Sequence, residues 1–284
     1  MENSVSPLTY YDAKLSAKDF ERLSKFIYGQ YGIKMPEAKH IMLQSRLQKR
    51  LRALQIPSFS DYVDYVFSPQ GETEIISMMD VVSTNKTDFF RENQHFEFLT
   101  DTILPEFYQV RRQNYVKVWS AGCSSGEEPY TLAIVLSEFA KRFRGFDFQI
   151  LGSDLSTIVL EKAVTAIYPE ERVSVIPMDL KKKYLLKSKD RTKPTVRIVP
   201  ELRAKTSFMR LNFMDDFYDV PNNFDIIFCR NVLIYFDRST QEKVINKLCR
   251  HLKPGGYFFL GHSESVTGIN VPLKQLKPTV FKRI

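Results

Sequence analysis

The chain has 284 residues, and its hydrophobic share of 43% is enough for a packed core in one large domain or two modest ones. The formal net charge of +8 points to an acidic partner without distinguishing nucleic acid, anionic lipid or protein. Three widely spaced cysteines and four unclustered histidines predict neither a disulfide framework nor a metal site. Because no apolar run approaches ~20 residues and residues 1–11 lack a signal-peptide core, we expect a cytoplasmic protein without membrane insertion.

The first part of the chain carries helix signals and no strand signals. Ser16 followed by Asp19 forms a capping-box pattern, and Ser58 with Asp61 repeats it further along. Between these two caps, four leucines recur at helical spacing: Leu43, Leu47, Leu51 and Leu54. We therefore predict a small all-helical N-terminal domain over residues 1–82.

The helix with this leucine stripe also carries four cations. Arg46, Lys49 and Arg52 lie roughly opposite the stripe on a helical wheel, and Arg50 lies at its edge. A solvated face is the usual meaning of such a run, and a binding surface for an acidic partner is the alternative.

From about residue 106 onward, strand patterns alternate with helix patterns, which is typical of a parallel sheet with helical crossovers. The predicted strands are residues 115–121, 148–153, 207–211, 224–229 and 257–260, with 279–282 as a further candidate. Helices are predicted at 157–167 and 240–252. We predict an α/β domain over residues 106–284, joined to the helical domain by a linker at 83–105.

A basic insert interrupts this alternation at about residues 170–206. Its cations are Lys181, Lys182, Lys183, Lys187, Lys189, Arg191, Lys193 and Arg197. The alternating pattern of residues 195–199 near its end predicts a small antiparallel β-subdomain.

A glycine-bearing turn joins the first predicted strand to the helix that follows it. Gly122 and Gly126 let the backbone approach a ligand closely, and the helix N-terminus offers unpaired N–H groups. Such a turn is typical of nucleotide-binding α/β domains. However, Glu127 and Glu128 in the first helical turn would repel a pyrophosphate and suit a ligand with hydroxyl groups or a positive charge. The turn therefore favours S-adenosylmethionine over a dinucleotide.

Polar residues follow three of the predicted strands, at the sheet edge where ligands of α/β domains bind. Asp154 suits a bidentate hydrogen bond to ribose hydroxyls, or else an N-cap of the next helix. Asn212 suits an adenine edge or an Asx-type turn. Core packing does not explain Arg230 and Asn231, which follow a wholly apolar strand end, while Tyr235 suits either a cleft or the core.

Four motifs occur in one order along the chain: Thr84-Asn85-x-Thr87-x-Phe89-Phe90-Arg91, Ser125-Gly126-Glu127-Glu128-Pro129-Tyr130, Cys229-Arg230-Asn231-Val232-x-Ile234-Tyr235-Phe236 and Gly261-His262-Ser263-Glu264. Together they resemble the CheR-type chemotaxis receptor methyltransferases, from about residue 15 to the end of the chain. The resemblance implies a Rossmann-like S-adenosylmethionine-dependent methyltransferase domain with an inserted β-subdomain, preceded by a small helical domain. It also implies O-methylation of glutamate side chains on the cytoplasmic helices of chemoreceptors, with S-adenosylhomocysteine as the product and no metal.

The resemblance also assigns site residues, motif by motif. It implies that the cofactor site is lined by Asn85, Thr87, Arg91, Glu127, Asp154, Asn212, Phe213, Asn231 and Val232. Arg91 and Tyr235 would lie nearest the transferred methyl group, as the catalytic pair. The basic face of Arg46, Lys49, Arg50 and Arg52 would bind the receptor helix, and the protein would act as a monomer. Residues 187–193 lack the glycine found where some relatives bind a receptor tail peptide, so the resemblance leaves that docking mode open.

Two other functions compete with this interpretation. The basic charge favours an RNA or DNA methyltransferase, but amino-group methylation in that class uses a Pro-Pro-aromatic motif where this chain has Arg230 to Leu233. Carbon methylation would need a nucleophilic cysteine in the cleft, and Cys229 is expected in the core. A cofactor-sensing adaptor without turnover is the non-enzyme alternative. We expect glutamate methylation and no nucleic-acid partner.

Overall fold

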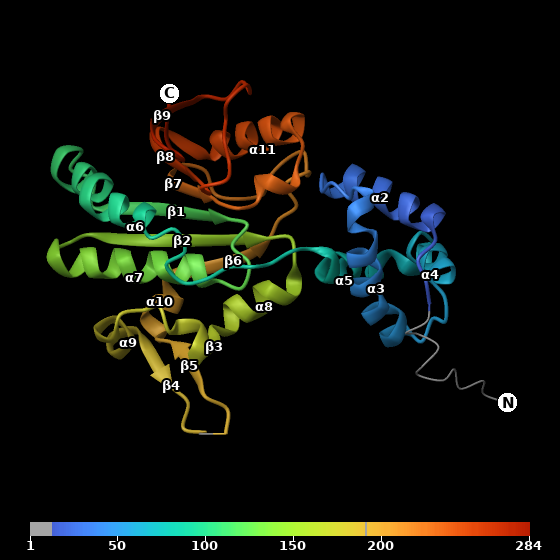
Figure 1. Ribbon diagram of the computed structural model, residues 1–284. Helices are drawn as coiled ribbons and strands as arrows, with labels where there is room; N and C mark the ends of the chain where they lie inside the picture. Colours follow the sequence, from blue (N-terminus) through green and yellow to red (C-terminus); the bar gives the residue numbers. More distant parts are fainter. Residues whose placement is uncertain (1–12, 191) are drawn as a thin grey trace.

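The computed structural model describes residues 13–190 and 192–284. The expectation for residues 1–11 and the predicted cation Arg191 lie outside the described residues. The described chain forms a helical bundle and an α/β domain, with a small second sheet inserted into the latter (Figure 1). This is the architecture that the sequence patterns and the resemblance predict.

The helical bundle contains α2 (Ala17–Tyr31), η1 (Glu37–Lys39), α3 (His40–Leu54), α4 (Phe59–Val66), η2 (Pro69–Gly71) and α5 (Glu72–Val82). Both predicted caps form, because the Ser16 hydroxyl accepts the Asp19 N–H and the Ser58 hydroxyl accepts the Asp61 N–H. The leucine stripe of α3 is fully buried at Leu43, Leu47 and Leu51. It packs in a separate core with side chains of α2, α4 and α5.

Three short helical segments connect the bundle to the sheet: α6 (Gln94–Phe98) and the π-helical turns η3 (Leu99–Ile103) and η4 (Glu106–Val110). Their apolar side chains, among them Phe96 and Phe107, join the core of the α/β domain. The predicted linker is therefore part of the packing of the α/β domain for much of its length.

The main sheet has seven strands in the order β6-β2-β1-β7-β8-β10-β9. They are β1 (Tyr115–Ala121), β2 (Asp147–Asp154), β6 (Thr206–Arg210), β7 (Phe224–Cys229), β8 (Leu252–Leu260), β9 (Leu273–Lys277) and β10 (Val280–Arg283). Strands β6, β2, β1, β7 and β8 are parallel, whereas β10 pairs antiparallel with both β8 and β9. Strand β8 begins five residues earlier than predicted, at Leu252, and the sequence pattern missed β9.

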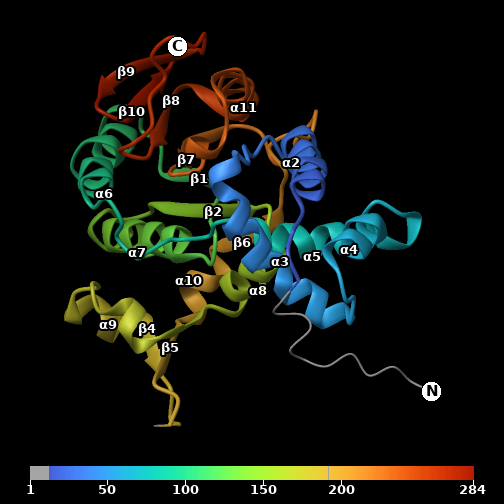
Figure 2. The ribbon, with the colours of Figure 1, turned by 45° about the vertical axis from the view of Figure 1, so that its right-hand side comes forward.

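Each face of the main sheet is covered by helices, since alternate strand residues point to opposite faces. Ile226 and Phe228 of β7 pack in the core with α6 and α7 (Glu127–Arg142). Ile227 and Cys229 pack on the other face with α11 (Arg238–His251). Helix α8 (Thr157–Thr165) lies beside the edge strand β6 (Figures 1 and 2).

The insert forms the antiparallel sheet β3-β5-β4. Its elements are β3 (Ile167–Pro169), η5 (Glu170–Val173), α9 (Met178–Tyr184), β4 (Leu185–Lys187), β5 (Thr195–Ile198) and α10 (Pro200–Ala204). Ile167 was predicted to be the last inward residue of a helix, but Ala166 takes a left-handed conformation that ends α8. Ile167 instead begins β3 and is exposed.

The helical bundle lies at the carboxyl ends of the parallel strands, as the arrowheads in Figure 1 show. Hydrogen bonds join the two parts: the Lys34 N–H donates to the Tyr235 carbonyl at 3.0 Å, and Asp80 accepts the N–H and hydroxyl of Thr157 at 2.7 Å each. The sheet edge predicted to bind a ligand is therefore covered by the other domain.

Candidate functional site

A cavity lies between the helical bundle and the carboxyl edge of the main sheet; we call it the interdomain cavity. Its walls come from the bundle, the linker and the loops after β1, β2, β6 and β7. Nine of the ten residues that the resemblance assigns to cofactor or catalysis line it: Asn85, Thr87, Arg91, Asp154, Asn212, Phe213, Asn231, Val232 and Tyr235. Segments separated by up to 150 residues thus meet at one site.

The glycine turn after β1 forms one wall of the interdomain cavity. Gly122 has φ +86°, and a Cβ atom there would lie 2.4 Å from Cγ2 of Val232. Gly126, with φ +93°, precedes α7, and a Cβ atom there would lie 2.9 Å from the Tyr168 hydroxyl. Both positions need glycine, because the conformation and the space exclude a side chain. Gly122 therefore brings its backbone to the cavity wall, whereas Gly126 lies outside the lining, against Ala163 and Tyr168.

Asp154 ends β2 beside this turn. Its carboxylate accepts the Ser124 N–H at 2.8 Å and the Ser156 N–H at 3.0 Å. Burial raises the pKa of Asp154 above its ordinary value, and these backbone hydrogen bonds oppose the rise. Asp154 therefore ties together two backbone segments and lines the cavity, but it does not cap the next helix, because the N-cap of α8 is Ser156 and no side chain caps that helix.

The two adjacent glutamates of α7 point to different surroundings. Glu128 lines the cavity and is bound by Arg230 at 2.7 Å and by the Ser120 hydroxyl at 2.7 Å. Glu127, which was expected at the cofactor, is fully buried outside the cavity lining. Its carboxylate accepts hydrogen bonds from Arg172 at 2.6 Å and from the Ser125 hydroxyl at 2.7 Å. The turn of the helix thus places Glu128 where the sequence motif suggested Glu127.

Arg91 and Tyr235 reach the cavity from the linker and from the loop after β7. The Arg91 guanidinium donates to the Lys86 carbonyl at 3.1 Å. Lys39 lies 5.7 Å from the centroid of the Tyr235 ring and also lines the cavity. Burial lowers the pKa of Lys39, and Arg46 contributes to the shift. Sequence patterns missed Lys39, because a lysine at the start of a helix is usually a solvated one.

Asn212 and Asn231 have partners of their own. The Asn212 amide donates to the Gln30 carbonyl at 2.9 Å, and its oxygen accepts the Met214 N–H at 3.1 Å. The Asx-type turn anticipated as an alternative is therefore present. Asn231 has a left-handed backbone, with φ +60°, and its amide donates to Glu92 at 3.2 Å.

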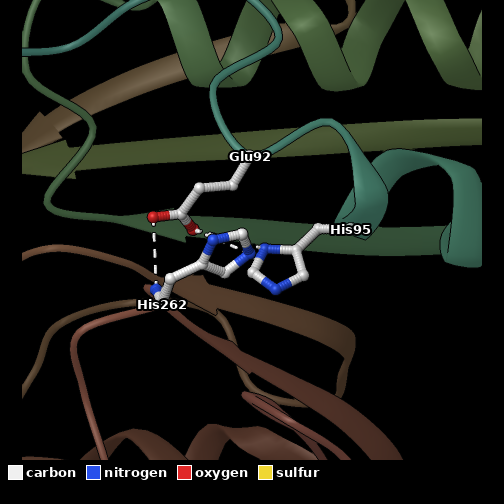
Figure 3. Close-up of side chains that lie close together, drawn as sticks. All are labelled: Glu92, His95 and His262. Atoms are coloured by element: carbon white, nitrogen blue, oxygen red, sulfur yellow. Dashed lines mark hydrogen bonds and ion pairs between the residues drawn. The ribbon is translucent and has the colours of Figure 1, made fainter.

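Glu92, His95 and His262 form the only group of three potential metal ligands found among the described residues (Figure 3). Arg230 donates to Nδ1 of His95 at 2.9 Å and lies 3.4 Å from Glu92, while Nε2 of His95 is bonded to the Thr279 hydroxyl at 2.8 Å. Both ring nitrogens of His95 are therefore engaged, and a guanidinium cation already lies beside the carboxylate. This arrangement does not fit a metal ion.

The basic face predicted on α3 divides into two pairs. Arg50 forms two hydrogen bonds with buried Glu74, at 2.8 and 2.7 Å, and Arg46 donates to the carbonyls of residues 82 and 83. Both arginines are half-buried and have hydrogen-bond partners within the protein. Lys49 and Arg52 are exposed, and they remain the candidates for that surface.

Among the described residues, no helix is long and apolar enough to cross a membrane. Cys229, considered as a possible nucleophile, is completely buried in the core, and burial raises the pKa of its thiol well above the ordinary value. The sequence prediction that this cysteine belongs to the core is confirmed.

Two family models match the chain. Residues 85–282 match the family model "CheR methyltransferase, SAM binding domain", and residues 18–83 match "CheR methyltransferase, all-alpha domain". The chain is 38% identical to the chemotaxis protein methyltransferase of Borreliella burgdorferi, over 95% of each protein. It is 40% identical to the chemotaxis protein methyltransferase of Klebsiella aerogenes, over 90% of this chain and 86% of the relative. It is 37% identical to that of Escherichia coli, over 88% of this chain and 85% of the relative. The protein therefore belongs to the CheR family of S-adenosylmethionine-binding methyltransferases.

Proposed function

We propose that this protein methylates glutamate side chains on the cytoplasmic helices of chemoreceptors, with S-adenosylmethionine as the methyl donor. Its relatives of 37–40% identity are chemotaxis protein methyltransferases. The observation that carries the proposal is that Arg91, Tyr235 and Asp154, from three separate segments, line a single interdomain cavity. One cavity thus offers groups for a cofactor and groups for an anionic acceptor. The protein would act in the cytoplasm, where those helices lie.

The interdomain cavity fits the cofactor chemically. The side-chain-free backbone of the glycine turn allows close approach, and Asp154 offers carboxylate oxygens to ribose hydroxyls. Asn212, Phe213, Asn231 and Val232 would line the adenosine side, with Asn85, Thr87 and Arg91 opposite. Glu128 would contribute negative charge near the sulfonium, in place of Glu127. When bound, the cofactor supplies a methyl group on a positively charged sulfur.

Methyl transfer to a carboxylate needs orientation more than proton transfer. A glutamate side chain has an ordinary pKa near ~4.3, so it is already an anionic nucleophile at neutral pH and needs no general base. Arg91 would hold the acceptor carboxylate and Tyr235 would orient it through its hydroxyl. Alignment and exclusion of water in such a site supply about 7–11 kcal/mol of barrier reduction. The helical bundle, which closes the cavity from one side, serves that exclusion.

The product of the reaction tests the proposal directly. The protein is incubated with radiolabelled S-adenosylmethionine and membranes that carry chemoreceptors. We expect a labelled band of receptor size whose label is released as volatile methanol at raised pH, because esters hydrolyse in mild alkali. An alkali-stable label, or label in added RNA or DNA, would contradict glutamate methylation and favour the nucleic-acid alternative.

Two substitutions separate cofactor binding from action on the acceptor. Asp154→Ala should weaken cofactor binding by about 1.5–3 kcal/mol, the cost of losing charge-assisted hydrogen bonds. Tyr235→Phe should lower kcat and leave cofactor affinity nearly unchanged, since only the acceptor meets the hydroxyl. Calorimetry with S-adenosylhomocysteine measures the affinities. An unchanged affinity in folded Asp154→Ala would remove this residue from the site.

A further inference from the structure

The loop after β7 is held by a single buried carboxylate. Asn231 takes a left-handed conformation, and the N–H groups of Asn231, Val232 and Leu233 then converge on Glu264 at 2.9, 2.9 and 2.7 Å. The Gly261 N–H donates to the same carboxylate at 2.6 Å. Consecutive N–H groups in such a conformation form an anion-binding nest. In this protein the nest is filled by the chain's own glutamate, which is 7% exposed.

This nest belongs to a wall of the interdomain cavity. Asn231 and Val232 line the cavity, whereas Glu264 does not. The Val232 side chain lies directly against Gly122 of the glycine turn, where a Cβ atom would be 2.4 Å from Cγ2. A shift of the loop would therefore press Val232 on the turn and move the residues expected at the adenosine. Gly261 lets its own loop approach Asn231 closely, because a Cβ atom at Gly261 would lie 2.5 Å from the side-chain Nδ2 of Asn231.

We infer that Glu264 is a positioning residue for the cofactor: its carboxylate fixes the backbone of residues 231–233 against the glycine turn without touching the ligand. One oxygen accepts the N–H groups of Asn231 and Gly261, and the other accepts those of Val232 and Leu233. An amide in place of the carboxylate has a single acceptor oxygen. In Glu264→Gln, two N–H groups would therefore lose their partner and face an NH₂ group. The inference rests on cofactor binding in this cavity, as proposed above.

The test compares Glu264→Gln with Asp225→Asn, a matched change at the opposite end of β7. Asp225 is also buried and accepts the Lys117 N–H at 2.8 Å and the Gln113 amide at 2.8 Å, but it does not line the cavity. Both variants replace a buried carboxylate that accepts several hydrogen bonds, and Asp225→Asn also loses an ion pair with Lys253 at 2.6 Å, so both should unfold at lower temperature. Only Glu264→Gln should bind S-adenosylhomocysteine about tenfold more weakly, and its KM for a receptor fragment should stay within about twofold of the wild-type value.

The outcomes separate the inference from the function on which it rests. If the wild-type protein fails to bind S-adenosylhomocysteine, cofactor binding itself is wrong. If the wild type binds and folded Glu264→Gln binds equally well, or if Asp225→Asn loses as much affinity, the positioning role is wrong. Should Glu264→Gln fail to fold, amide exchange of the wild type decides. Slow exchange of the backbone amides of residues 231–233 and 261 supports their hydrogen bonds to Glu264 and hence its positioning role. Exchange at the rate of an exposed loop overturns that role.

Discussion

Glu127 and Glu128 are adjacent in the sequence, yet they belong to different regions of the molecule. Glu128 faces the end of β7, where Arg230 has a side chain only 2% exposed, with its guanidinium 5.2 and 5.6 Å from the ring centroids of Phe96 and Phe228. Glu127 faces the inserted subdomain, where the side chain of Arg172 is 36% exposed and also contacts Asp88 at 3.0 Å. Two glutamate–arginine pairs of similar length, at 2.7 and 2.6 Å, thus differ in solvent access.

Because of this difference in solvent access, we expect the surroundings of Arg230 to be rigid and those of Arg172, at the border of the inserted subdomain, to tolerate substitution. A charge in the interior cannot turn to water when its partner is removed, so the loss of one partner is costly. At the border the carboxylate of Glu127 is also buried, but Arg172 is 36% exposed and can turn to water when that carboxylate is removed. The side of the cavity formed by β7 should therefore be the rigid one, and the side joined to the insert through Arg172 should tolerate change. Four predictions test this contrast, from the largest expected effect to the smallest.

Arg230→Gln should lower the free energy of unfolding by about 3–5 kcal/mol, because Glu128 would keep a buried charge without its partner. Urea denaturation followed by circular dichroism measures the change. The double variant Arg230→Gln with Glu128→Gln should recover part of the loss. A loss below about 1 kcal/mol for the single variant would show that water reaches Glu128, and the contrast between the two regions would disappear.

The pH dependence of stability should report on His95, in the same buried network. Burial lowers the pKa of His95 to about 4, and Arg230 contributes. In the unfolded chain the pKa of this histidine is about 6.5. Between about pH 6.5 and about pH 4 the unfolded chain therefore binds a proton that the folded protein does not bind, and the free energy of unfolding should fall as the pH drops from about 6.5 to about 4. The upper limit of this loss is about 3 kcal/mol. Unfolding curves of wild type and His95→Gln that stay parallel across this range would contradict the assignment.

Glu127→Gln should cost only about 1 kcal/mol of stability, because the cation that it leaves, Arg172, is 36% exposed and keeps Asp88 as a partner. Arg172→Gln should cost more, because it leaves the buried carboxylate of Glu127 without its cation, and the double variant should recover part of that loss, since the two residues are partners. Calorimetry with S-adenosylhomocysteine sharpens the test. If Glu127→Gln weakens binding by the same factor in the Arg172→Gln background, then Glu127 meets the cofactor itself, as the family resemblance implied.

The smallest effect on the protein's stability is expected at the exposed cations of α3. Reversing the charges of Lys49 and Arg52 should change the free energy of unfolding by less than about 0.5 kcal/mol and leave cofactor affinity unchanged. The KM for receptor should rise severalfold at low salt, and the difference from wild type should shrink as salt increases. Equal KM values at every salt concentration would show that this face is merely solvated.

The fold and most of the residues that line the cavity can be predicted from the sequence, because they depend on strand order and on local hydrogen bonds. Parallel strands bring their carboxyl ends to one edge, so residues that follow separate strands, such as Asp154, Asn212 and Asn231, must lie near one another. The caps at Ser16 and Ser58 are equally local, since each depends on a hydrogen bond to a residue three positions away. Strand β9 was missed because its exposed, lysine-containing sequence lacks an apolar alternation.

Sequence patterns do not give the partner of a charged side chain. Arg46 and Arg50 share a helix with Lys49 and Arg52 and have similar chemistry, but only the packing of α5 against α3 reveals that Glu74 binds Arg50. Likewise, the motif around Glu127 suggested a contact with the cofactor, whereas in the structure Glu127 binds Arg172 of the insert, 45 residues away.

By itself, the sequence determined the helical bundle, the alternating α/β domain, the insert and the family, because periodicity, caps and motifs are local properties of the chain. The tertiary structure alone decided which carboxylates face the interdomain cavity and which are paired elsewhere. It also disclosed the role proposed for Glu264, whose four donors come from two loops thirty residues apart. The physical reason is that a charge's role depends on its burial and on the partners within hydrogen-bond distance, and both are fixed only when distant segments pack together.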